Sequence, residues 1–215
     1  GQARPSQNTV LPQSPYYDEA LASSWATFDP EKANALLDEI GLTKRDGDGI
    51  RLMPNGRRLE IVVESAGERS LEADVLQLVR ESWAKIGVAL HTAQSQRDVF
   101  LQRIFAGDTV MSVWQGWDNG LITPTTGPTQ LAPVDQNWLT GGGAGEKPDL
   151  DFGEKLMALY AEWRGTTDAA RRDAIMREMV KIQADEVTSI GTVQGVLQPV
   201  VVKTRLHNVP EKGIF

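Results

Sequence analysis

The stretch LEIVVESAGERSLEADVLQLVRESWAKIGVALHTA, residues 59–93, contains two kinds of apolar pattern. Residues 59–65 form a short apolar and β-branched run, which predicts a strand. Apolar residues then recur every three or four positions from Leu71 to Ile86, which marks one face of a helix. Residues 88–93 return to the strand pattern. This succession predicts a right-handed β-α-β unit with parallel strands.

The residues that follow extend the same alternation. RDVFLQRIFAG (97–107) predicts a short helix, and TVMSVWQGW (109–117) predicts a third strand. The β-α-β-α-β order therefore predicts an α/β fold with a mostly parallel sheet and helices on both faces.

The segment before the first strand also has clear signals. Asp29 is a suitable N-cap and Pro30 fits the first helical position, so a helix is expected up to Gly41. Asp-Gly and Asn-Gly pairs between residues 42 and 58 predict a small hairpin.

The outer segments are less regular. The proline-containing residues 1–28 predict an irregular arm, and residues 118–150, rich in Gly, Pro and Thr, predict a long excursion. Two amphipathic helices are expected at 151–164 and 167–186, followed by one or two strands within 188–215.

Composition excludes several classes of function. The net charge is −7 and no basic cluster is present, which argues against binding to nucleic acid or to an anionic membrane surface. The absence of cysteine excludes disulfides, thiol catalysis and thiolate metal sites. The first residues are polar and lack the pattern of a secretion signal, so we expect either a cytoplasmic protein or one from which an upstream part has been removed.

Two motifs resemble binding loops but fail in detail. Residues 46–49, Asp-Gly-Asp-Gly, begin like a calcium-binding EF-hand loop, but Arg57 stands where the bidentate Glu is needed. Residues 141–147, GGGAGEK, resemble a phosphate loop, but Glu146 replaces the required glycine and Pro148 follows the lysine. The sequence therefore predicts no metal site and no cofactor.

The stretch MSVWQGWDNG, residues 111–120, is the strongest candidate for a binding site. In an open α/β sheet, ligands bind outside the carboxyl ends of the strands, where this stretch is expected. If the strand stays extended, Trp114 and Asp118 share one face, while Gln115 and Trp117 point the other way. A tryptophan ring suits stacking on a sugar ring or a peptide side chain, although burial of both rings in the core is the alternative.

The candidate site extends slightly beyond this strand end. The excursion adds one further tryptophan that the fold could bring near the same edge. The candidate ligand-binding residues are Trp114, Gln115, Trp117, Asp118, Asn119 and Trp138.

Three segments carry a resemblance to a known family. FDPEKANALLDEIGLTKRDGDGIRLMPNGRRLEIVVE (28–64), TGGGAGEKP (140–148) and the stretch 190–210 resemble the family 5 extracellular solute-binding proteins of bacterial ABC importers. The similarity covers nearly all of this chain but only the second lobe of the two-lobed members.

The resemblance implies a division of the chain and a function. It implies a periplasmic-binding-protein-like second lobe at 29–187, an arm at 1–28 that crosses from the first lobe, and strands at 188–215 that return toward it. The expected function is capture of a small-molecule solute in the periplasm or at the cell surface and its delivery to an ABC permease. The expected partners are the solute, the permease and the first lobe of the same protein, with no catalytic residues.

One departure from the family pattern bears on the solute. Peptide receptors that this chain resembles carry an aspartate shortly after the third-strand tryptophan, and its carboxylate pairs with the peptide ammonium. Here Trp117 occupies the expected position and Asp118 comes one residue later, which turns the acid to the other face of an extended strand. This order favours an oligosaccharide over an oligopeptide, and both classes stay open.

Two other functions compete with import. An α/β hydrolase or transferase would use Asp118 as acid or base, but the sequence lacks a nucleophile motif, a phosphate loop and a metal cluster. A receptor-derived sensor or chaperone module would share the sequence features of a transporter component.

Overall fold

The computed structural model describes residues 3–114, 150–196 and 199–211. The chain forms two compact units, named here the sheet unit, residues 28–114, and the helical unit, residues 1–27 with 115–215. None of the helices in the described ranges is long and apolar enough to cross a membrane.

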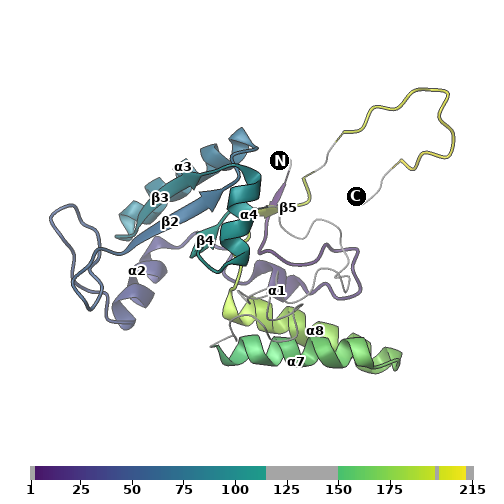
Figure 1. Cartoon of the computed structure of the whole chain (residues 1–215), viewed down its shortest axis with the longest axis horizontal. Helices are drawn as coiled ribbons and strands as arrows, with labels where there is room; N and C mark the ends of the chain where they lie inside the picture. Colours follow the sequence, from purple (N-terminus) through teal and green to yellow (C-terminus); the bar gives the residue numbers. More distant parts are fainter. Residues whose placement is uncertain (1–2, 115–149, 197–198, 212–215) are drawn as a thin grey trace. The chain divides into compact units, whose positions relative to one another are not determined.

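Three parallel strands form the centre of the sheet unit, in the order β3-β2-β4 (Figure 1). Two helices make the connections, α3 between β2 and β3 and α4 between β3 and β4. This confirms the β-α-β-α-β succession expected from the sequence. The elements are β2 (Glu60–Ser65), α3 (Ser70–Lys85), β3 (Ala89–Gln94), α4 (Arg97–Phe105) and β4 (Met111–Ser112).

The two connecting helices cover opposite faces of this sheet. On one face Val63 of β2 and Leu90 of β3 are buried against Leu76 of α3. On the other face Glu64, the next residue of β2, pairs with Arg103 of α4. The reason is topological: the step from β2 to β3 and the step back over β2 to β4 run in opposite directions, and right-handed connections then place their helices on opposite faces.

The segment before β2 folds as expected. Helix α2 (Pro30–Glu39) begins after Asp29, whose carboxylate accepts a hydrogen bond of 2.9 Å from the Lys32 amide. Antiparallel bridges join Arg45 to Arg51 and Leu52 to Arg58, which confirms the small hairpin.

The Asp-Gly-Asp-Gly motif forms the turn of this hairpin. The side chain of Asp46 accepts hydrogen bonds from the amides of Asp48, at 2.9 Å, and of Ile50, at 3.0 Å. The carboxylate therefore holds the backbone of the turn, as is usual for aspartate in this setting.

A buried arginine joins the hairpin to its neighbours. The Arg51 side chain is 1% exposed, and its guanidinium donates to Ile86 O at 2.8 Å, to Leu42 O, to Asn34 Oδ1 at 2.8 Å and to the Asp38 carboxylate. These acceptors come from the end of α3, from the loop after α2 and from α2 itself. One guanidinium therefore ties three segments together.

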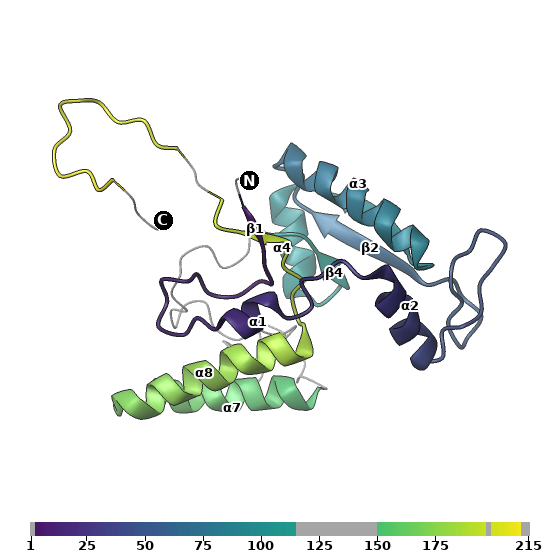
Figure 2. The same cartoon turned by 180° about the vertical axis from the view of Figure 1, so that it is seen from behind.

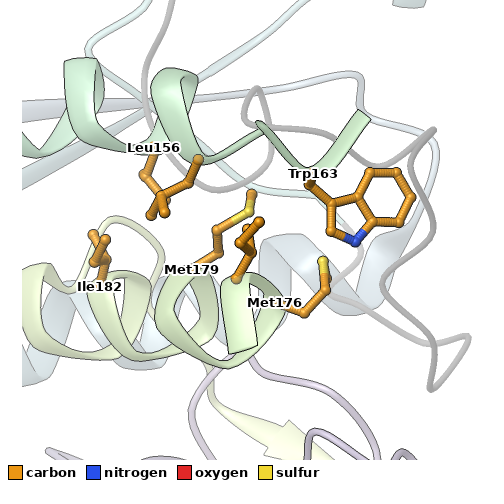
Figure 3. Packing of buried hydrophobic residues seen from close by; sticks show 7 residues of the cluster. Leu156, Trp163, Met176, Met179 and Ile182 are labelled. Carbon is orange, nitrogen blue, oxygen red and sulfur yellow. The ribbon is translucent and has the colours of Figure 1, made fainter. Parts of the chain in front are cut away.

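The helical unit is built on α7 (Asp151–Gly165) and α8 (Ala169–Glu186), which lie side by side (Figures 1 and 2). These confirm the two helices expected at 151–164 and 167–186. Their apolar faces meet in one core, shown in Figure 3, made of Leu156, Leu159, Trp163, Ile175, Met176, Met179 and Ile182.

A residue of α8 caps the carboxyl end of α7. The guanidinium of Arg172 lies 3.7 Å from the centre of the Trp163 ring and donates to the carbonyl oxygens of Trp163, at 2.8 Å, and Thr166, at 3.2 Å. It supplies hydrogen bonds that the last carbonyls of a helix otherwise lack.

Three sequence expectations need correction. The arm 1–28 contains the short strand β1 (Arg4–Pro5) and the helix α1 (Glu19–Ser23), whose start is capped by the Asp18 carboxylate. The C-terminal strands reduce to β5 (Val193–Gln194) within the described residues, because only these two residues pair, antiparallel to β1.

The third correction concerns the strand expected at 109–117. Within its described part, residues 109–114, the strand is Met111–Ser112, because beyond a bond of 3.0 Å from the Val113 amide to Glu64 O the Trp114 ring packs on Phe100 of α4. The excursion at 118–150 lies outside the described residues except for Leu150.

The segments around β1 and β5 approach very closely. Gln183 of α8 is buried and donates to Asn8 O at 3.0 Å and to Ser189 Oγ at 2.9 Å. A Cβ atom on Gly191 would lie 2.1 Å from the Asn8 backbone nitrogen and 2.3 Å from the Gln7 carbonyl carbon. Only glycine leaves room for this contact, because the obstructing atoms belong to the backbone.

We predict that Arg51→Met lowers the free energy of unfolding by about 3 kcal/mol, because it removes the hydrogen bonds to the Leu42 carbonyl and the Ile86 carbonyl and breaks the ion pair with Asp38. Urea unfolding measures the change. The matched control Arg57→Met removes an exposed arginine of the same hairpin and should change stability by less than about 0.5 kcal/mol. Equal effects of the two substitutions would contradict the role given to Arg51.

Gly191→Ala should destabilise the protein by about 2 kcal/mol or more, because the added methyl group meets backbone atoms that cannot move without breaking the β1–β5 pairing. Thermal unfolding measures this. Gly165→Ala is the control, since a Cβ atom at that helix end meets nothing within 4 Å. A variant at Gly191 that unfolds like the wild type would show that the arm is not packed in this way.

Candidate functional site

The carboxyl ends of the three parallel strands lie along one edge of the sheet, called here the carboxyl edge. The last strand residues are Ser65 in β2, Gln94 in β3 and Ser112 in β4. A backbone hydrogen bond of 3.1 Å from the Ser95 amide to Ser65 O holds the first two chain segments together beyond the ladder. Side chains that follow these strands are therefore brought to one place, where open α/β sheets bind ligands.

Trp114 stands at this edge, two residues after β4. Its ring stacks on Phe100 of α4 with the ring centres 5.6 Å apart and the planes at 19°. Phe100 is fully buried, whereas 44% of Trp114 is exposed. The alternative that the Trp114 ring is buried in the core is therefore wrong: the ring is fixed on one neighbour and partly open to solvent.

Two charged residues at this edge were missed by sequence reasoning. Arg97, the first residue of α4, lies with its guanidinium carbon 5.2 Å from the centre of the Trp114 ring. Its Nη1 is 3.4 Å from each carboxylate oxygen of Glu68, which follows β2. The sequence could have indicated them by position, because each follows an expected strand. The carboxyl ends of parallel strands bring such residues together although they are distant in the sequence.

The other predicted site residues are not placed by the structure. Gln115, Trp117, Asp118, Asn119 and Trp138 lie outside the described residues. Their role in binding stays a prediction.

A small polar hollow lies beside the carboxyl edge, between α3 and the ends of β2 and β3. Its volume is about 50 Å³, and its lining includes Ser65, Gln77, Arg80, Thr92 and Gln94. This is room for one or two water molecules and far less than the several hundred Å³ of a ligand pocket. The hollow is therefore too small for a sugar or a peptide.

An ion pair between α4 and β2 holds α4 on the sheet beside the carboxyl edge. Arg103 donates to the two carboxylate oxygens of Glu64 at 2.8 and 2.9 Å. These hydrogen bonds lower the pKa of the Glu64 carboxyl group below its ordinary value of 4.5. The pair fixes α4, and with it Phe100 and Arg97, against the central strand.

The described acidic and histidine side chains do not gather into a cluster that could hold a metal ion. Within residues 3–114, 150–196 and 199–211, the structure contains no group of three or more His, Asp or Glu side chains placed to hold a metal ion. What the described residues offer is an aromatic face, a cation and hydrogen-bonding groups, which suits recognition of a solute.

Glu64→Gln should lower the free energy of unfolding at pH 7 by about 1 kcal/mol, since Arg103 stays partly solvated. The folded-state pKa of Glu64 lies below the unfolded one, so its contribution is complete above pH 4.5 and is lost as the pH falls through the folded value. The difference between wild type and variant, measured by urea unfolding, should therefore shrink below pH 4.5. Glu162→Gln, which breaks an exposed pair with Arg171, is the control and should change stability less.

Comparison with known proteins shows the family. Residues 1–137 match the model of the bacterial extracellular solute-binding proteins, family 5. The nickel-binding periplasmic protein of Escherichia coli K12 is 24% identical over 212 residues, which cover 98% of this chain and 38% of that protein.

Solved structures of similar proteins agree. An oligopeptide-binding protein OppA is 30% identical, with a TM-score of 0.75 over 90% of this chain and 34% of its own. The periplasmic binding protein MelB of Agrobacterium fabrum C58, solved with stachyose, shares the fold at 19% identity, with a TM-score of 0.67 over 88% of this chain and 30% of its own. The chain thus spans about a third of the length of these relatives. It belongs to family 5 of the bacterial extracellular solute-binding proteins.

Proposed function

We propose that the chain is the second-lobe part of the substrate-binding component of an ABC importer. It captures an oligosaccharide or an oligopeptide in the periplasm or at the cell surface, and a membrane permease receives the solute. The observation that carries this proposal is Trp114, a half-exposed ring held at the carboxyl edge of a sheet in a solute-binding family.

The fixed position of the ring supports recognition. Because Phe100 and Arg97 hold Trp114, little side-chain freedom is lost when a solute stacks on the ring, which lowers the cost of binding. Trp117, Asp118 and Asn119 follow within five residues in the sequence and are proposed to complete the binding surface with Gln115 and Trp138.

The domain division is part of the same proposal. In it, residues 29–187 form the second lobe, and the segments 1–28 and 188–215 connect it to a first lobe. The antiparallel pairing of β1 with β5 supports this, because it brings the two connecting segments side by side. A hinge formed by such segments would allow two lobes to close on a solute.

The two solute classes have different support. Trp117 in place of the acid of the peptide receptors favours a sugar, and the fold neighbour MelB was solved with stachyose. The more similar OppA is named for oligopeptides. No observation favours an enzyme that uses Asp118, and the family is described as one of binding proteins.

Trp114→Ala should weaken solute binding by about tenfold or more in the intact receptor that contains this lobe, because a stacking surface is lost. Mass spectrometry identifies the small molecule retained on purification, and calorimetry with that molecule measures the affinity. The control Leu78→Ala truncates an exposed apolar residue of α3 and should leave the affinity unchanged. A receptor that retains no solute, or one that turns its solute over chemically, would overturn the proposed function.

A further inference from the structure

The ion pair between Arg97 and Glu68 is loose. Both distances from Nη1 to the carboxylate oxygens are 3.4 Å, longer than the roughly 2.7–2.9 Å of a good charge-assisted hydrogen bond. Both side chains are about half exposed. The supporting pair of Arg103 and Glu64, at 2.8 and 2.9 Å, shows the tighter geometry that the same chemistry adopts nearby. An exposed, long pair stabilises little, so another carboxylate can replace Glu68 at low cost.

The guanidinium of Arg97 is nevertheless held in place. It lies against the Trp114 ring, and a cation at 5.2 Å from the ring centre gains from the electron-rich face. Among the residues that the structure describes, Glu68 accepts the only hydrogen bonds of this guanidinium. A planar group with five N–H donors therefore has donors left over from its contacts with the described residues, at the place where the solute is proposed to bind.

Three other described arginines near the sheet are engaged differently. Arg51 and Arg80 donate to backbone carbonyls, and Arg103 binds the buried Glu64. Arg97 differs from these three because its partner, Glu68, is an exposed carboxylate at a long distance.

We propose that Arg97 binds a carboxylate of the solute in place of Glu68, while the solute stacks on Trp114. This inference rests on the proposed function and narrows its solute to one that carries a carboxylate. The carboxylate belongs either to an acidic sugar or to the C-terminus of a peptide, since both present the same pair of oxygens to the guanidinium. Glu68 acts as the internal counter-ion that the solute displaces.

Paired probes test this in the intact receptor. Isothermal titration calorimetry compares trigalacturonate with neutral maltotriose, and trialanine with trialanine amide. We expect the carboxylate member of one pair to bind more tightly than its neutral partner. Arg97→Gln should weaken that member by about 10- to 100-fold and weaken the neutral partner far less, because only the acidic member loses its ion pair. Glu68→Gln should strengthen it several-fold, because the competing carboxylate is gone.

The controls separate recognition from support of the fold. Arg57→Gln removes the same charge from the exposed hairpin and should change no affinity. If Arg97 only stabilised the edge through Glu68, then both Arg97→Gln and Glu68→Gln would weaken binding. The proposal is supported if Arg97→Gln weakens binding, Glu68→Gln strengthens it, and the thermal unfolding of all three variants is unchanged.

The measurements distinguish a failure of the Arg97 inference from a failure of the proposed import function. If maltotriose or trialanine amide binds as tightly as its acidic counterpart and Arg97→Gln changes both equally, the inference is wrong and the proposed import function stands. If none of the four probes binds and no solute is retained on purification, both are overturned.

Discussion

The sheet unit depends most on the buried guanidinium of Arg51. Its donors satisfy carbonyl and side-chain oxygens from α2, from the loop after it and from the end of α3. Its backbone amide donates to Gly87 O at 2.8 Å, shortly before β3. Its carbonyl oxygen accepts from the Leu59 amide at 2.7 Å, directly before β2. A Cβ atom on Gly87 would lie 2.8 Å from Arg51 Cγ, so the helix end must be glycine for the arginine to fit. The amino ends of two strands are thereby fixed.

The carboxyl edge, where recognition is proposed, lies at the other end of these strands. Parallel strands that start from an anchored end finish together, and the connections to α3 and α4 leave on opposite faces of the sheet. Glu64 and Arg103 then fix α4 on the central strand, which sets the positions of Phe100 and Arg97 under the Trp114 ring. In the proposed function, stability depends on the amino ends and recognition on the carboxyl edge of the same strands, so residues at the carboxyl edge can vary with the solute at little cost to folding.

Sequence reasoning succeeded where the signal was local. The helices α2, α3, α7 and α8 were predicted close to their bounds because each has an apolar stripe, and α2 also has a capping aspartate. It was wrong for β4, because Val110 to Trp114 are apolar enough for a longer strand, while the length of a strand depends on the partner it pairs with. It also missed β1, since two residues give no periodic pattern and pair only with a segment far along the chain.

The sequence by itself determined the α/β class, the order of the elements and the aromatic stretch at the end of the third strand, because period and turn chemistry act over a few residues. It also carried the family resemblance that the comparisons confirmed. Only the tertiary structure decided that Trp114 is half-exposed, that Phe100 supports it and that Arg97 and Glu68 meet beside it. The physical reason is that the carboxyl edge is made of residues from three separate loops, and their approach is set by strand order and helix packing, which no local pattern encodes.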